Sequence, residues 1–441
     1  MRHLLQRERT GTLTCDTPRV TLQGMVLSTV SFVIVAFLCS IALESLIVSA
    51  YAQHQESAPA SYASIGSNGV RYAGPRREAA YDLTEPVISI GLLAPLSGAQ
   101  KAEGDAMVTA AHMALQDTSS VFLAGGRRVA LVTGDESGPS WGHTSNVLIQ
   151  LVSKEQVVAV VTSANGDAAH ISEQVGNRLG IPILTLSSDV TTTQTNVPWI
   201  FRVGPSDALE AQVMAQDIYR GRGYTKVLLV TERDHDGRVG GEALQDAARE
   251  GGASTPDFFL LDPLQPDTDG LVARIEMQPP EAIIVWTQPE TARKVMQVIW
   301  KAHAGIPLYL SQQAAQSGSD VEASAPEDRE PEEGGGVWTV VSGENGSNTR
   351  GEFARRYRVA TGMYPSAAAT ETYDAICLTV RALSATGPNR ARIRDQIAGV
   401  KEFTGASGVI SFDSEGNSSS GGHLVRMKTR QDALQIIEVA K

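Results

Sequence analysis

The sequence predicts an α/β protein of two lobes, each built on a parallel β-sheet and joined to the other by a hinge. Near-continuous apolar runs alternate with segments of helical apolar spacing, and this alternation restarts after about residue 205. Apolar strands separated by amphipathic helices are typical of a parallel sheet covered by helices on both faces. A length of 441 residues is enough for two compact domains.

The first 52 residues have the pattern of an export signal. A basic head precedes an apolar run over residues 25–43, and Ala50-Tyr51-Ala52 has the small-x-small form of a cleavage site. We predict cleavage after Ala52; the alternative is an uncleaved anchor, because the run is about as long as a membrane-spanning helix. Either way the folded part is expected in the periplasm or another extracytoplasmic space. Residues 53–86 are rich in Ser, Ala, Gly and Pro and are predicted to form a flexible linker.

The first lobe is predicted over residues 87–205, with part of 340–400. Its strands are expected at 87–94, 127–133, 157–162 and 181–186. Helices are expected at 103–118, 141–154 and 167–179, the last with Asp167 as its N-cap.

The second lobe is predicted over residues 206–339, with the C-terminal strands. Its strands are expected at 225–231, 257–261, 281–286 and 306–310, and its helices at 239–250, 268–277 and 289–303. Acidic residues 316–336 indicate an exposed loop. The remaining elements are a strand at 337–343, helices at 350–361, 367–385 and 389–400, and strands at 408–413 and 422–427.

Composition excludes several classes of function. A net charge of −12 and 5% aromatic residues argue against nucleic-acid binding. Three cysteines leave neither a disulfide pair in the mature domain nor a zinc ligand set, and the scattered histidines show no H-E-x-x-H motif. Residues 138–142 fit the G-x-S-x-G pattern of a hydrolase, but Ser140 is separated from its strand and follows a proline. We therefore predict no enzyme activity, no cofactor and no metal.

Hydroxyl groups crowd one stretch, GIPILTLSSDVTTTQ (180–194), directly after a predicted strand. Ligands of open α/β sheets bind beyond the carboxyl ends of the strands, so this stretch is expected to face a cleft between the lobes. The alternative is a turn whose hydroxyls bond to the backbone, and this applies above all to Thr192, Thr193 and Thr195.

The chain from about Val87 to Met427 resembles the type I periplasmic binding proteins, in the branch that binds leucine, isoleucine, valine or amides for ABC importers. The matching phrases are ISIGLLAPLSGAQKAEGD (88–105), GIPILTLSSDVT (180–191), WIFRVGPSD (199–207), GYTKVLLV (223–230) and SGVISFDSEGN (407–417). The resemblance implies two Rossmann-like lobes over residues 87–441. It also implies that amides and hydroxyls of two loops bind the ligand's charged head. The matching positions are Ser163, Ala164, Asn165, Thr185, Ser187, Ser188 and Asp189.

Three positions depart from the pattern that the resemblance implies. A threonine is expected at Asp189, an aromatic residue at Glu103 and a tyrosine at Asp236. Carboxylates at these positions would repel the carboxylate of a simple aliphatic amino acid, so a cationic or donor-rich ligand is predicted. Solvated loop charges are the alternative for Glu103 and Asp236.

Three further side chains are candidates for the same site. Gln265 and Gln288 offer neutral hydrogen-bonding groups, and Trp286 could stack on a flat or cationic group. The alternative for Trp286 is a core residue at the end of a strand.

These observations predict a solute-binding protein that closes around a small polar ligand and presents it to an ABC permease. The rival prediction is a sensory or cell-wall-regulating receptor domain of the same fold. Neighbouring permease and ATPase genes would favour transport, whereas an uncleaved N-terminal segment would favour a tethered sensor.

Overall fold

The computed structural model describes residues 76–118, 126–138, 141–195, 197–303, 305–315, 336–342, 348–419, 421–430 and 433–439. All of them belong to one compact unit, Ala60–Lys441. The predicted export segment, Ser140 and most of the acidic loop lie outside the described residues. Within the described part of the chain, no helix is both long and apolar enough to cross a membrane.

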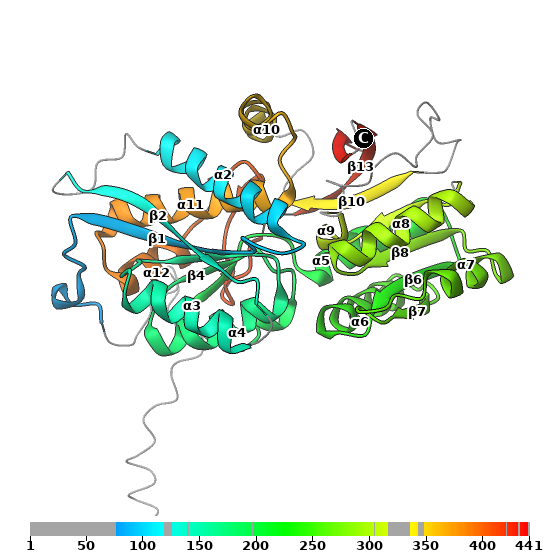
Figure 1. The fold of residues 1–441 in the computed structure, drawn as a ribbon, viewed down its shortest axis with the longest axis horizontal. Helices are drawn as coiled ribbons and strands as arrows, with labels where there is room; N and C mark the ends of the chain where they lie inside the picture. Colours follow the sequence, from blue (N-terminus) through cyan, green and yellow to red (C-terminus); the bar gives the residue numbers. More distant parts are fainter. Residues whose placement is uncertain are drawn as a thin grey trace, which may run out of the picture. The chain divides into compact units, whose positions relative to one another are not determined.

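The first sheet has five parallel strands in the order β2-β1-β3-β4-β5 (Figure 1). The strands are β1 (Val87–Ala94), β2 (Arg128–Asp135), β3 (Val160–Thr162), β4 (Ile183–Thr185) and β5 (Ile200–Arg202). Backbone bonds from Arg202 to Gly416 and from Ser418 to Arg202 attach a C-terminal segment to the edge of β5. We call this sheet and the helices packed on it lobe 1.

Helices cover both faces of this sheet. They are α2 (Lys101–Asp117), α3 (Trp141–Ser153), α4 (Gly166–Leu179), α11 (Ala367–Thr386) and α12 (Arg390–Ala398). The helix α10 (Asn348–Thr361) packs on α2 and α11 through Phe353 and Tyr357. One core lies between β1 and the helices α2, α11 and α12, and includes Leu92, Met107 and Ile376. The opposite face packs on α3 and α4 through Leu93, Leu148 and Ile183. The short pair β11 (Phe403–Thr404) and β12 (Val409–Ile410) adjoins the first core.

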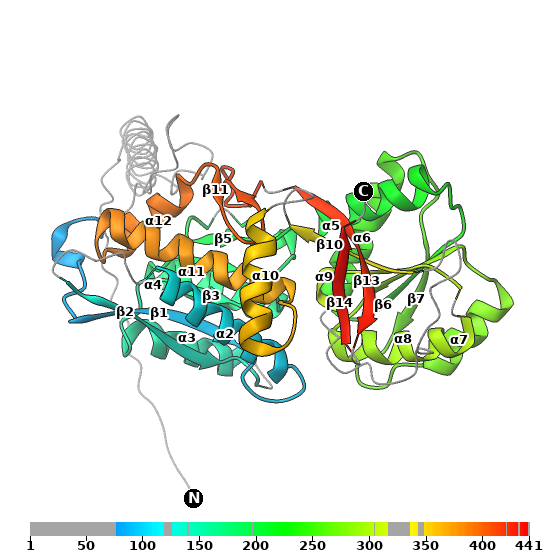
Figure 2. The ribbon, with the colours of Figure 1, turned by 90° about the horizontal axis from the view of Figure 1, so that it is seen from above.

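The second sheet has seven strands in the order β14-β13-β10-β9-β8-β6-β7. The strands are β6 (Val227–Glu232), β7 (Asp257–Leu261), β8 (Ala282–Trp286), β9 (Leu308–Leu310), β10 (Val337–Ser342), β13 (Gly422–Arg430) and β14 (Ala433–Val439). The strands β6 to β10 are parallel, whereas β13 pairs antiparallel with β10 and with β14 (Figure 2). This sheet and its helices form lobe 2.

Lobe 2 is also covered on both faces. Its helices are α5 (Asp207–Ala215), which continues as a π-helix over Gln216–Gly221, α6 (His235–Glu250), α7 (Thr268–Met277), α8 (Pro289–His303) and α9 (Gln312–Ala315). Leu229, Leu244 and Met214 pack on the side of α5 and α6. Val230, Ile275 and Met296 pack on the side of α7 and α8. The predicted fold class of two parallel-sheet lobes is therefore confirmed.

Several boundaries differ from the prediction. The elements β5, α5, α9 and β14 were not predicted, and in place of the strand expected at 408–413 the structure has β12 (Val409–Ile410) and an isolated bridge from Phe412 to Ser418. Residues 76–86, expected to belong to the flexible linker, bond to α12. Arg77 pairs with Asp395, and Arg392 reaches Asp82 at 2.5 Å. These opposite charges hold the end of the predicted linker to lobe 1.

Candidate functional site

The loop after β4 is organised by its own side chains. The Thr185 hydroxyl accepts a hydrogen bond from the Ser187 amide at 3.1 Å, and the Ser187 hydroxyl accepts one from the Asp189 amide at 3.3 Å. Asp189 continues the series, because its Oδ1 accepts from the Thr191 amide at 2.9 Å and from the Thr191 hydroxyl at 2.7 Å. Short polar side chains favour such local bonds to the backbone, which explains the run of hydroxyl residues.

Arg202 of β5 donates hydrogen bonds to the backbone and to side chains of this loop. The side chain is fully buried, and its Nη1 donates to the carbonyl oxygens of Ser187 and Asp189, both at 2.8 Å. Its Nη2 donates to the Thr193 hydroxyl at 2.9 Å. The Thr192 hydroxyl donates to the Asp189 carbonyl at 2.8 Å. The hydroxyls of Thr192 and Thr193 thus bond to the loop itself and to Arg202. This agrees with the alternative prediction that these threonines stabilise a turn.

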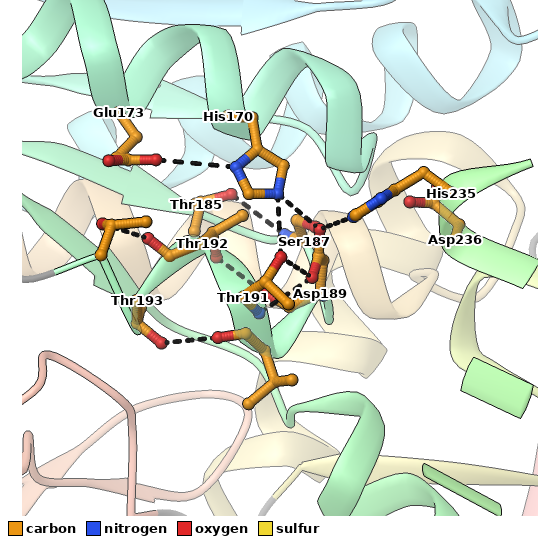
Figure 3. A network of polar contacts seen from close by, with 12 residues as sticks. His170, Glu173, Thr185, Ser187, Asp189, Thr191, Thr192, Thr193, His235 and Asp236 are labelled. Atoms are coloured by element: carbon orange, nitrogen blue, oxygen red, sulfur yellow. Dashed lines mark hydrogen bonds and ion pairs between the residues drawn. The ribbon is translucent and has the colours of Figure 1, made fainter. Parts of the chain in front are cut away.

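Asp189 also joins the two lobes (Figure 3). Its Oδ2 lies 2.8 Å from Nε2 of His170, on α4 of lobe 1, and 2.7 Å from Nε2 of His235, the first residue of α6 in lobe 2. Behind His170, the Glu173 carboxylate lies 3.6 Å from Nδ1. One carboxylate therefore bonds to two imidazoles from different lobes.

The hydrogen bond between His170 and Asp189 favours the charged form of both side chains. The bonds to Asp189, and then to Glu173, raise the pKa of His170 to about 9. Burial alone would raise the pKa of Asp189, but the bonds from His170, Thr191 and His235 outweigh it and hold this pKa well below its usual range. At neutral pH the pair of Asp189 and His170 is therefore ionic.

A second interlobe contact lies beside the first. Gln288, after β8, donates to Asp236 Oδ2 at 3.2 Å and accepts from Gln100 of lobe 1 at 3.4 Å. Asp236 is half-buried and lies against Gly166 at the start of α4, where an added Cβ would lie 2.3 Å from Asp236 Oδ1. This oxygen has no hydrogen-bond partner among the described residues. Burial, followed by the charges of neighbouring aspartates, raises the pKa of Asp236 to about 8.

Lobe 1 has two further carboxyl groups that act on each other electrostatically, half-buried Glu103 and buried Glu136. Burial, with the charge of Glu371, raises the pKa of Glu103 to about 7. Burial also raises the pKa of Glu136, to about 8, although Ser163 donates a hydrogen bond to its Oε1. Glu136 Oε2 has no hydrogen-bond partner in the described part of the chain. A cation or a hydrogen-bond donor placed next to these carboxyl groups would favour their ionised form.

The other predicted site residues have varied surroundings. Asn165 is the N-cap of α4 and accepts from the Ala168 amide at 2.8 Å, so the assignment of this cap to Asp167 was wrong. Ala164 packs against the lobe 1 core. The Ser188 carbonyl accepts from the Asp207 amide at 2.8 Å. Trp286 lies in the lobe 2 core, as its alternative states, and Gln265 is exposed in the turn after β7.

His170, His235 and Glu136 were not predicted as site residues from the sequence. A signal was present for two of them, because Glu136 follows β2 directly and His235 follows β6 within a short turn, both at carboxyl ends of parallel strands. His170 lies inside a helix, and only the fold brings it to Asp189. Together, His170, Asp189 and His235 place three potential metal-ligand atoms within 4.8 Å of one another.

Comparisons with known proteins agree with this architecture. A family model described as periplasmic binding protein matches residues 87–430. The Leu/Ile/Val-binding protein homolog 3 of Brucella melitensis is 24% identical over 197 residues, which cover 44% of this chain and 53% of that protein. The match thus spans about half the length of this relative.

Solved structures show the same fold at low sequence identity. The branched-chain amino acid transporter substrate-binding protein of Streptococcus pneumoniae, in complex with isoleucine, has a TM-score of 0.66 at 20% identity, over 80% of this chain and 99% of that one. A solute-binding protein of an ABC transporter from Rhodopseudomonas palustris BisB5, in complex with 3,4-dihydroxybenzoic acid, has a TM-score of 0.68 at 19% identity, over 81% and 97%.

Proposed function

Because the chain belongs to the periplasmic binding protein family, we propose that it is an extracytoplasmic solute-binding protein rather than an enzyme. In this proposal it captures a small polar ligand between its lobes and delivers it to an ABC importer. The observation that carries the proposal is the meeting of polar side chains from both lobes, with Asp189 after β4 opposite His235 after β6. A ligand that contacts both lobes would stabilise their closed arrangement.

The charge of the region supports a particular ligand class. Asp236 Oδ1 and Glu136 Oε2 are buried acceptors without a hydrogen-bond partner among the described residues. A ligand that offers amine or amide N–H groups would satisfy such acceptors, whereas a plain carboxylate would bring a second negative charge close to the ionised Asp189. We therefore propose an amino acid derivative, an amide or a related compound with a cationic or donor-rich end.

A thermal-shift screen tests the ligand class. The purified protein is heated with amino acids, amides, polyamines, aromatic acids and small sugars, and a true ligand raises the melting temperature by mass action. We expect amine- or amide-bearing compounds to give the largest increase. If aromatic or aliphatic acids without an amine stabilise the protein instead, the proposed ligand class is wrong.

Calorimetry then tests the site. The substitution Asp189→Asn should weaken binding of a cationic ligand more than tenfold, because it removes the negative charge between the lobes. Asp246→Asn, at an exposed position of α6 that pairs with Arg249, is the matched control and should leave affinity unchanged. Equal affinity in Asp189→Asn and the parent protein would remove Asp189 from the binding site.

An uptake assay separates transport from sensing. Deletion of the gene should abolish uptake of the labelled ligand by intact cells if the protein serves an importer. Unchanged uptake in the deletion strain, with ligand binding by the purified protein intact, would favour a sensory role.

A further inference from the structure

We propose that His170, Asp189 and His235 form a binding site for a divalent transition-metal cation such as Zn²⁺, and that the bound cation links lobe 1 to lobe 2. The inference goes beyond the proposed function, since it concerns side chains of this chain and requires no organic ligand. Two imidazoles and one carboxylate are a ligand set that such cations prefer.

The geometry brings the three ligand atoms together from three separate elements. Oδ2 of Asp189, after β4, lies 2.8 Å from Nε2 of His170 on α4 and 2.7 Å from Nε2 of His235 on α6. One ligand atom from each of the three residues lies within 4.8 Å of the other two. Bonds of about 2.1 Å in a tetrahedral zinc site place ligand atoms about 3.4 Å apart. Small side-chain rotations therefore suffice to receive the cation, and a fourth position remains open to water or to a ligand.

Neighbouring groups already orient two of the three ligands. The Thr191 amide and hydroxyl both bond to Asp189 Oδ1, which directs Oδ2 toward the imidazoles. The Glu173 carboxylate lies 3.6 Å from Nδ1 of His170, on the far side of the ring from the site (Figure 3). A carboxylate behind a metal-binding imidazole fixes the orientation of the ring and increases its basicity.

The surrounding charge favours a cation independently of the ligand set. Asp236 follows His235 in the sequence and lies beside it (Figure 3), and its buried Oδ1 has no hydrogen-bond partner among the described residues. A cation bound beside His235 would bring a positive charge close to this buried oxygen, because bound metal ions are the largest local charges in a site.

The cation must displace the proton that lies between His170 and Asp189. Arg238 also opposes metal binding, and it offers a sharp test. Arg238 Nη2 lies 3.0 Å from Nδ1 of His235. A guanidinium can only donate, so this contact places the imidazole hydrogen on Nε2, the atom that must bind the cation. Arg238 is exposed, with a side-chain exposure of 60%, and it can turn away into solvent. Replacing it with a residue that accepts from Nδ1 should favour the metal-binding tautomer of His235.

The test is a zinc titration by isothermal calorimetry of the chelator-treated, tag-free full chain, with no organic ligand present. We expect one equivalent of Zn²⁺ with micromolar or tighter affinity. His235→Gln and Asp189→Asn should each weaken binding at least tenfold, and Arg238→Gln should tighten it at least threefold. His112→Gln, an exposed histidine of α2, is the matched control and should bind as the parent does.

Circular dichroism of each metal-free variant confirms that it folds. Absence of zinc binding by the parent would overturn the inference, as would equal affinity in His235→Gln and the parent. If a histidine variant fails to fold, the zinc affinity of Arg238→Gln still tests the site. A zinc affinity of Arg238→Gln equal to or weaker than that of the parent would contradict the proposed geometry. A failed zinc titration leaves the proposed solute binding untouched, since that is measured with organic compounds.

Discussion

Replacing Arg202 with methionine removes the charged group that connects the loop after β4 to the neighbouring strand β5. Arg202 is fully buried, and its guanidinium donates at 2.8 Å to the carbonyl oxygens of Ser187 and Asp189 and at 2.9 Å to the Thr193 hydroxyl. Methionine fills a similar volume but donates no hydrogen bond. The substitution therefore leaves buried acceptors of this loop without their partner.

The expected loss of stability follows from these contacts. A buried acceptor that loses its partner costs about 1–3 kcal/mol, and breaking a buried charged network from one side costs about 3–5 kcal/mol. Burial lowers the pKa of Arg202, and the charges of Asp207, Asp189 and Asp413 oppose this shift. Removal of the Arg202 charge also takes a nearby positive charge away from these carboxylates. We therefore expect the free energy of unfolding to fall by about 3–5 kcal/mol.

Urea unfolding at pH 7, followed by circular dichroism, measures this loss. Arg178→Met, at an exposed position of α4, is the matched control and should change stability by less than about 0.5 kcal/mol. Arg202→Lys keeps the charge but loses the forked donor geometry, so it should lie between the two. A loss in Arg202→Met no larger than that in Arg178→Met would refute the role assigned to Arg202.

Two further predictions concern buried positions of lobe 1. Burial raises the pKa of Glu136 in the folded protein to about 8 from its ordinary value of 4.5, so the folded protein holds an extra proton between these two pH values. Glu136 should therefore contribute a fall in stability of about 1.4 kcal/mol per pH unit across this window, and the slope of Glu136→Gln in urea unfolding at pH 5 to 8 should be less steep than that of the parent by about this amount. Identical slopes would contradict the buried, protonated carboxyl. Gly416 has φ of +85°, and a Cβ there would lie 2.5 Å from the Ile200 carbonyl oxygen, so Gly416→Ala should cost roughly 1–3 kcal/mol. Gly421→Ala, with no atom within 4 Å of its added Cβ, is the control for the melting temperature.

Much of the fold could be predicted because the apolar pattern is local. The run DFFLL and the segment 268–277 are bounded by turn residues, and the structure has a strand and a helix with the same bounds. The strand β5 was missed because it has only three residues and ends in Arg202, a charged side chain that local patterns assign to the surface. Its burial depends on carbonyl groups of a loop that precedes it, which no local pattern reports.

Part of the candidate site could be predicted from the order of strands and helices alone. Carboxyl ends of parallel strands indicate where Asp189 and Asp236 lie, since that rule needs only the order of elements. The bond between Asp189 and His235 depends on how one lobe faces the other, and the position of His170 depends on which side of α4 meets the loop. Neither follows from spacing along the chain.

The interleaving of the chain affects when each lobe can fold. Lobe 1 needs α11 from residues 367–386, and lobe 2 needs β10 and β13 from residues 337–342 and 422–430. A nascent chain that has reached residue 315 therefore lacks parts of both cores, although most of its strands have been synthesised. Completion of both lobes waits for the last hundred or so residues. We propose that this protein acts outside the cytoplasmic membrane. Because both lobes need residues near the C-terminus, the chain would not complete its fold in the cytoplasm until its synthesis is almost finished.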